Sequence, residues 1–237
     1  MLTINADDWG GWKTATDAAK ECCSLGRINS VSAMVFMEDS LRAAELSRGM
    51  GVSVGLHVNF TGTFDGPNCP AELLRHQNRV RRFLKSSKYA VLIFNPFRCR
   101  SFRLLFSAQY EEFLRLYGKP PTHFDGHQHM HLCSNMLLQR LIPPGYRVRR
   151  SFSFSAGDKS LANRKYRQWV DSRLAQDYRL TDYFFALSQN LQSQKFQKIK
   201  ELSERADVEV MTHPEKKEEY EFLRNHDVLA SLNVGGA

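Results

Sequence analysis

The chain has 237 residues, of which 42% are hydrophobic, and it carries a net charge of +8 at pH 7. This length suits one large domain, since α/β barrels run to roughly 200–250 residues, and the composition argues against disorder. Five cysteines without C-x-x-C spacing argue against a disulfide framework and a cysteine zinc site. No apolar run reaches the roughly 18–20 residues that span a bilayer, and the N-terminus lacks an export signal. We therefore expect a cytoplasmic protein, which could also bind peripherally at the inner membrane surface.

Short apolar strands alternate with helical patterns along the chain. The first 60 residues predict three strands and two intervening helices, namely strands at 2–5, 30–36 and 52–60 and helices at 13–25 and 38–48. Further strands are predicted at 122–125, 146–149, 182–187 and 208–212, and further helices near 134–141, 160–175, 192–205 and 216–224. This order is typical of parallel strands joined by helical crossovers. We therefore expect a distorted or incomplete (β/α) barrel formed by residues 1–237 as a single domain, with an open doubly wound sheet as the alternative.

Polar side chains stand at the carboxyl ends of four predicted strands, where the loops of a parallel α/β fold meet on one face. They are Asp7 and Asp8 after the first strand, His57 in the third, Asp125 and His127 at the fourth, and His213 after the last. Together they offer carboxylate and imidazole ligands without thiolate, which suits a hydrolytic divalent metal ion. Each also has a simpler interpretation: the aspartate pair as a helix cap, His57 as a core residue, and His213 as the residue before a proline-started helix.

The segment "PTHFDGHQHMHL" (121–132) contains four of the eight histidines. In an extended chain alternate residues face the same side, so His127, His129 and His131 would point together. This arrangement favours, as an alternative, a binuclear metallohydrolase that uses all three. His131 precedes a helical pattern and could instead belong to a turn, and His123 could equally pack or form a hydrogen bond.

Four motifs carry a resemblance to a known family: "NADDWG" (5–10), "GLHVNFTG" (55–62), "PTHFDGHQHMHL" (121–132) and "VMTHPE" (210–215). In this order and at these separations they resemble the YdjC-like carbohydrate deacetylases, which include chitooligosaccharide deacetylases and hopanoid-biosynthesis deacetylases. The resemblance implies a distorted barrel of the polysaccharide-deacetylase type. It also implies metal-dependent removal of an N-acetyl group from an amino sugar, an N-acetylated oligosaccharide or a glycolipid, with release of acetate.

The resemblance also implies residue roles. Asp8, His57 and His127 match the family's metal ligands for one divalent ion, Mg or Zn, and Asp7 matches its general base. Amide hydrolysis also needs an acid that protonates the departing amine, and His213 is our candidate because imidazole titrates near neutral pH.

Three further residues are expected to support the site. Asp125 could orient a histidine ligand. His129 could line the sugar site or form a hydrogen bond behind His127, and Arg149, which matches an arginine after the fifth strand in relatives, could bind substrate or hold Asp7.

The positive charge is concentrated in one segment. Residues 73–110 contain nine Lys or Arg and no Asp or Glu, and residues 73–117 fall where relatives carry a variable insertion. This segment is either a pair of solvated helices or, because aromatic and aliphatic residues alternate with the basic ones over 79–106, a surface that lies on anionic lipid. The second interpretation predicts a lipid-linked or anionic sugar substrate. No nucleic-acid-binding module accompanies the charge. The alternative from another class of function is a non-catalytic barrel that binds membrane or nucleic acid. A homodimer is also left open.

Overall fold

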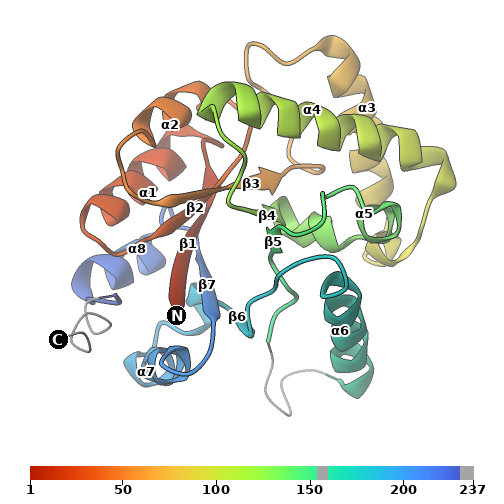
Figure 1. Cartoon of the computed structure of the whole chain (residues 1–237). Helices are drawn as coiled ribbons and strands as arrows, with labels where there is room; N and C mark the ends of the chain where they lie inside the picture. Colours follow the sequence, from red (N-terminus) through yellow and green to blue (C-terminus); the bar gives the residue numbers. More distant parts are fainter. Residues whose placement is uncertain (154–159, 230–237) are drawn as a thin grey trace.

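The computed structural model describes residues 1–153 and 160–229 (Figure 1). Within these residues a parallel sheet has the strand order β5-β4-β3-β2-β1-β7-β6. The strands are β1 (Leu2–Trp9), β2 (Ser30–Ala33), β3 (Ser53–Val58), β4 (His123–Gly126), β5 (Arg147–Val148), β6 (Tyr183–Ala186) and β7 (Val208–Thr212). The order of strands and crossovers confirms the predicted incomplete (β/α) barrel and excludes the open doubly wound sheet.

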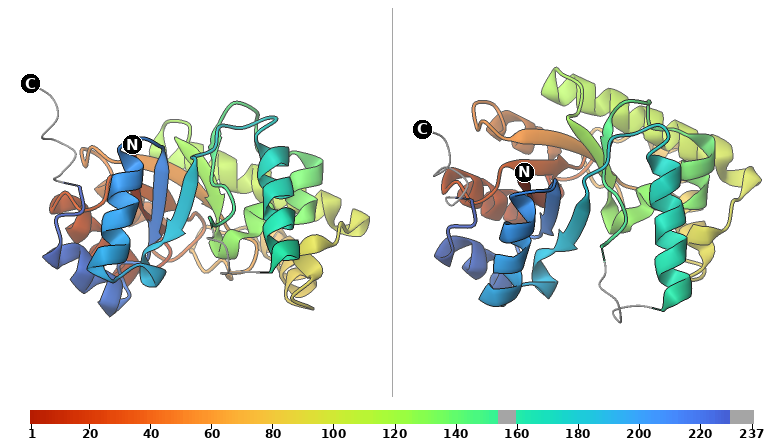
Figure 2. Two further views of the ribbon diagram at one scale, coloured as in Figure 1. Left: turned by 90° about the horizontal axis from the view of Figure 1, so that it is seen from below. Right: turned by 60° about the horizontal axis from the view of Figure 1, so that its bottom comes forward.

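Helices cover the outside of the strands (Figures 1 and 2). Figure 1 shows α1, α2 and α8 along one flank and α4 across the other side, where it packs on α3. The α-helices are α1 (Lys13–Ser24), α2 (Ser40–Leu46), α3 (Ala71–Leu84), α4 (Cys99–Tyr117), α5 (Ser134–Gln139), α6 (Leu161–Leu174), α7 (Ser193–Ser203) and α8 (Lys217–Asn225). Short 3-10 helices are η1 (Ala90–Leu92), η2 (Pro96–Arg98), η3 (His127–Leu132) and η4 (Leu187–Gln189). Within the described residues, no helix combines the length and hydrophobicity needed to cross a membrane.

The strands alternate between apolar and polar residues although both kinds are buried. The apolar positions belong to the core under the helices and include Ile4, Ala6, Val31, Ala33, Leu56, Phe124, Val148, Val208 and Val210. The polar positions hydrogen-bond to one another from strand to strand and include Asn5, Asp7, Ser32, His57, His123, Asp125, Arg149 and Glu209. Because successive side chains of a strand point to opposite faces, the second set fills the inside of the barrel. The interior is therefore a polar network that lies directly beneath the carboxyl ends of the strands.

The sheet is nearly closed between its two edge strands. At β5, Val148 N–H donates to the carbonyl of Arg179, which precedes β6, at 3.0 Å, and Arg179 N–H donates to the carbonyl of Tyr146 at 2.9 Å. Further along, Ser153 N–H donates to the carbonyl of Phe184 in β6 at 2.9 Å. These bonds join the edges without a continuous ladder, which explains why the barrel is incomplete.

A close contact between two strands gives a first prediction. Gly55 in β3 faces the His123 ring of β4, and a Cβ at position 55 would lie 2.3 Å from His123 Nε2. We expect Gly55→Ala to lower the free energy of unfolding by about 1–3 kcal/mol through overpacking, measured by urea denaturation. Ser53→Ala, at the exposed start of the same strand, is the control. Gly55→Ala with the stability of the wild type would contradict this packing.

Candidate active site

The sequence predicted that Asp7 and Asp8 follow the first strand. In the structure both lie within β1. The strand continues to Trp9 because its pairing with β2 shifts register between Ala6 and Trp9, a β-bulge. Asp8 has a φ of 59°, a left-handed conformation that aspartate tolerates better than most residues. In a regular strand consecutive side chains would face opposite sides. The bulge instead lets Asp7 reach into the barrel while Asp8 reaches the histidines at its rim.

Asp8, His57 and His127 form a compact group of potential metal ligands. One ligand atom from each lies within 4.8 Å of the others. Asp8 Oδ1 is 3.3 Å from His57 Nε2 and 2.9 Å from His127 Nδ1. Burial raises the pKa of Asp8, but hydrogen bonds from His127 and His57 outweigh it and lower that pKa well below its usual range. One carboxylate and two imidazoles without thiolate match the donor set of a hydrolytic zinc-type site.

Asp125 holds His57 in the orientation that this group needs. Its Oδ1 accepts from His57 Nδ1 at 2.8 Å, and its Oδ2 accepts from Ser32 Oγ at 2.7 Å. This leaves His57 Nε2 directed toward Asp8, the arrangement found behind histidine ligands of metals. Burial lowers the pKa of His57, but the carboxylates of Asp125 and Asp7 raise it to about 10, so a proton competes with a metal ion for Nε2.

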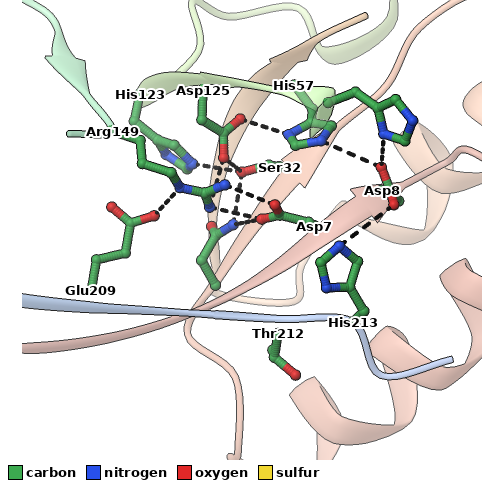
Figure 3. A network of polar contacts seen from close by, with 12 residues as sticks. Asp7, Asp8, Ser32, His57, His123, Asp125, Arg149, Glu209, Thr212 and His213 are labelled. Carbon is green, nitrogen blue, oxygen red and sulfur yellow. Dashed lines mark hydrogen bonds and ion pairs between the residues drawn. The ribbon is translucent and has the colours of Figure 1, made fainter. Parts of the chain in front are cut away.

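Arg149 lies at the centre of the polar network (Figure 3). Its side chain is fully buried and contacts three carboxylates: Asp7 at 2.7 Å through both terminal nitrogens, Asp125 at 2.7 Å and Glu209 at 2.6 Å. The Phe184 ring covers the guanidinium, with 4.9 Å between Cζ and the ring centroid. Asp7, His57 and Asp125 also form a possible ligand group, but a guanidinium already bound to two of its members disfavours a cation there.

Asp7 is buried and ionised. Burial raises its pKa, but the charge of Arg149 outweighs this effect and lowers the pKa. Its Oδ1 also accepts from Asn5 Nδ2 at 2.8 Å. The carboxylate is thus fixed beside the Asp8 group, and Arg149 holds it, which is one of the two functions that the sequence suggested for this arginine.

His213 approaches Asp8 from the opposite side to the other two histidines. Its Nε2 is 3.8 Å from Asp8 Oδ2, and it follows β7 (Figure 3). Its backbone N–H donates to Glu219 Oε2 at 2.8 Å, and the same oxygen accepts from Thr212 Oγ1 at 2.8 Å. The bond to α8 fixes the loop that carries the imidazole, whose side chain stays 19% exposed and is open to a ligand from solvent.

The histidines of 127–131 do not point together, so the expected period-two alignment is wrong. The segment is not extended: it forms η3, with Gln128 and His129 at φ of 53° and 58°. His129 packs edge-on against Phe152, with ring centroids 4.7 Å apart, and His131 Nε2 donates to the Arg149 carbonyl at 3.0 Å. Among the described residues neither belongs to a group of three potential ligands, which removes the geometric basis of the binuclear alternative.

The sequence did not single out three residues of the network: Asn5, Ser32 and Glu209. His123, for which packing or a hydrogen bond was one of the expected roles, does hydrogen-bond within the network. Ser32 Oγ contacts Asn5 Nδ2 at 2.8 Å and His123 Nε2 at 3.0 Å besides Asp125, whereas Glu209 contacts Arg149. The sequence pattern that could have identified them is the recurrence of polar residues at alternate positions of otherwise apolar strands, as in "NAD" (5–7) and "SVS" (30–32).

The fold and the site place the chain among parallel half-barrels with a histidine and aspartate cluster at the strand ends. A solved structure from Enterococcus faecalis V583, described as that of a protein proposed to cleave cellobiose phosphate, has a TM-score of 0.63 at 16% identity and covers 98% of this chain and 93% of its own. The profile of the family described as YdjC-like protein matches residues 1–234. The chain therefore belongs to the YdjC-like family, which confirms the resemblance drawn from the four motifs.

Two curated relatives carry enzyme names. The chitooligosaccharide deacetylase of Escherichia fergusonii is 29% identical over 223 residues, which are 90% of this chain and 81% of the relative. The carbohydrate deacetylase of Mus musculus is 33% identical over 135 residues, which are 55% of this chain and 43% of the relative.

Burial of His131 predicts a loss of stability in acid. Burial lowers its pKa to about 4, although the Asp125 charge opposes this effect. In the unfolded chain this histidine binds a proton below about pH 6.5, whereas in the folded chain it does so only below about pH 4. Its contribution to the free energy of unfolding is therefore complete above about pH 6.5 and is lost as the pH falls to about 4. We expect the drop in unfolding free energy between pH 7 and pH 4.5 to be smaller, by roughly 1–3 kcal/mol, in His131→Gln than in the wild type. Equal drops in urea denaturation would contradict the assignment.

Proposed function

We propose that this protein is a metal-dependent carbohydrate deacetylase that removes an acetyl group from the nitrogen of an amino sugar. The observation that carries the proposal is the contact of Asp8 with His57 and His127 beside the ionised Asp7. The family membership and the names of the relatives support the reaction class. The reaction adds water across the amide bond, so that acetate and a free amine leave.

Asp8, His57 and His127 are the residues that would hold the metal. Two imidazoles and one carboxylate favour Zn²⁺ over Mg²⁺, because Mg²⁺ prefers oxygen ligands. A divalent metal at these atoms supplies Lewis acidity, which makes water more acidic and polarises the acetyl carbonyl. Asp125 keeps His57 oriented through its hydrogen bond to Nδ1.

Two residues would move protons. Asp7 is the proposed general base, because it is ionised and Arg149 fixes its position. Its suitability as a base comes from this fixed position, which shortens the proton transfer, and not from a high basicity. His213 is the proposed acid because it is partly exposed beside Asp8 and opposite His57 and His127. It would give its proton to the nitrogen that leaves. His213 would then act from the side of Asp8 that lies opposite the two proposed histidine ligands.

The surface over 85–98 favours a substrate presented at an anionic membrane. Its apolar side chains are exposed, with Phe97 at 89% and Ile93 at 54%, and the surrounding segment 73–110 carries only positive charge. Apolar groups flanked by Lys and Arg bind the interface of anionic lipid. We propose peripheral contact of this face with such a membrane.

Substitutions separate the base from the metal ligands. Asp7→Asn should reduce acetate release by about 100-fold or more while the metal content stays at that of the wild type. His57→Ala and His127→Ala should lose the metal as well. His226→Ala, at a histidine whose ring donates to the Phe222 carbonyl of α8, is the matched control and should keep both properties. Full metal occupancy in both ligand variants would refute the ligand assignment.

Membrane contact is tested by flotation with phosphatidylglycerol vesicles at low salt. The wild type should float with the vesicles, and Phe97→Glu should reduce the bound fraction at least about fivefold, because it places a negative charge at the interface. Leu41→Glu, at a residue that is 57% exposed on α2, is the control and should float like the wild type. If the wild type stays in solution at low salt, this part of the proposal fails.

A further inference from the structure

A cavity opens beside the candidate metal centre. It lies between η1, η3 and α6 and has a volume of about 590 Å³, within the range of small-molecule sites. Much of its wall is apolar and comes from Leu92, Met130, Leu132, Phe152, Tyr166 and Val170. None of the described residues that line it is an Asp or Glu. Sugar hydroxyls therefore find no carboxylate partner there, whereas a hydrocarbon chain would be shielded from water.

The cavity is adjacent to the proposed site of reaction. Gln128 and His129 line it and directly follow His127, one of the proposed metal ligands. The His129 ring lies 5.9 Å from Phe184, whose ring in turn covers Arg149. The loop that carries a proposed metal ligand therefore also forms part of the cavity wall.

His129 also offers a polar atom at this junction. Its Nδ1 is buried and has no hydrogen-bond partner among the described residues. An unsatisfied buried nitrogen of this kind is stabilised by a ligand group that hydrogen-bonds to it.

The charged side chains that line the cavity are basic. Lys88, Arg150 and Arg167 line it. Arg150 is held by Asp171, with 2.8 Å between Nη2 and Oδ2, whereas Lys88 lies 5.0 Å from the Tyr89 ring. Tyr89 and Leu92 line the cavity and are also 57% and 46% exposed, so the apolar wall continues onto the basic surface over 85–98. This continuity suits a chain that enters from a lipid layer with an anionic group at its head.

We propose that this cavity binds the hydrocarbon chain of the substrate, which is an amino sugar joined through an anionic linkage to a lipid. The inference rests on the proposed function for the sugar, but the cavity itself can be tested without catalysis. The hydrocarbon chain lies against α6 and η1, the anionic linkage meets the basic side chains of the lining, and the N-acetyl group reaches Asp8 and His213.

Binding of alkyl phosphates to the wild-type chain is the direct test, with butyl, octyl and dodecyl phosphate below their micelle concentrations as the probes in calorimetry. The dissociation constant should fall by up to about fourfold per added methylene, the gain from burying one such group, with one molecule bound per chain. Affinity that does not change with chain length would overturn the proposal.

Two variants of α6 locate the site. Tyr166→Glu, at a cavity-lining residue that is 36% exposed, should weaken dodecyl phosphate binding at least about tenfold. Leu161→Glu, on the same helix, 60% exposed and outside the cavity lining, is the matched control and should bind like the wild type. Equal weakening by both variants, or by neither, would overturn the assignment of the cavity.

A kinetic comparison links the cavity to the reaction. Acetate release from octyl and methyl glycosides of N-acetylglucosamine should show a KM for the octyl compound at least about tenfold lower, and Tyr166→Glu should remove the difference. The same KM for both would refute the lipid-linked substrate. Alkyl phosphate binding without acetate release from any N-acetyl sugar would support the cavity while refuting the proposed function.

Discussion

The ion pairs of Arg149 inside the barrel are the interaction on which the rest of the site depends. Three carboxylates, from Asp7, Asp125 and Glu209, come from three different strands and meet one guanidinium that is shielded from solvent. Without that charge they would repel one another in a medium of low dielectric constant and would take up protons. Removal of one partner from such a buried set typically costs about 3–5 kcal/mol.

Two consequences reach the rim of the barrel. Arg149 keeps Asp7 ionised and fixed, and through Asp125 it controls the orientation of His57. The bulge in β1 directs the two adjacent aspartates to different partners. Asp7 joins the interior network, and Asp8 faces the histidines. A single aspartate on a regular strand could not face both. The geometry of the proposed ligands is thus set from beneath, by Arg149 and Asp125 inside the barrel.

Much of the fold could be predicted from the sequence, because strands and helices alternate with clear periods. The segment "VEVMT" was predicted to the residue as β7, and the alternation of elements indicated parallel strands. The errors arose where backbone geometry departs from the period. The bulge at Asp8 extended β1 beyond its predicted end, and the left-handed residues Gln128 and His129 turned the chain away from the extended form that would have aligned three histidines.

The site was only partly visible in the sequence for a related reason. The residues at the rim stand at strand ends, where position alone suggests function, and the sequence singled them out. Ser32 and Glu209 lie deeper in strands and look like ordinary polar substitutions until the barrel brings them against Asp125 and Arg149. The number of carboxylates that one arginine neutralises depends on the curvature of the sheet, which no local pattern encodes.

The most direct test of the account is the kcat for acetate release by Arg149→Lys, with its fold checked by circular dichroism and its metal content measured. A lysine keeps the charge but presents a single ammonium group, which cannot form the forked contacts to Asp7 while also meeting Asp125 and Glu209. We predict that kcat falls by about 100-fold or more, because the base and the oriented histidine lose their fixed positions. A folded, metal-loaded variant with a kcat within about twofold of the wild type would contradict the account.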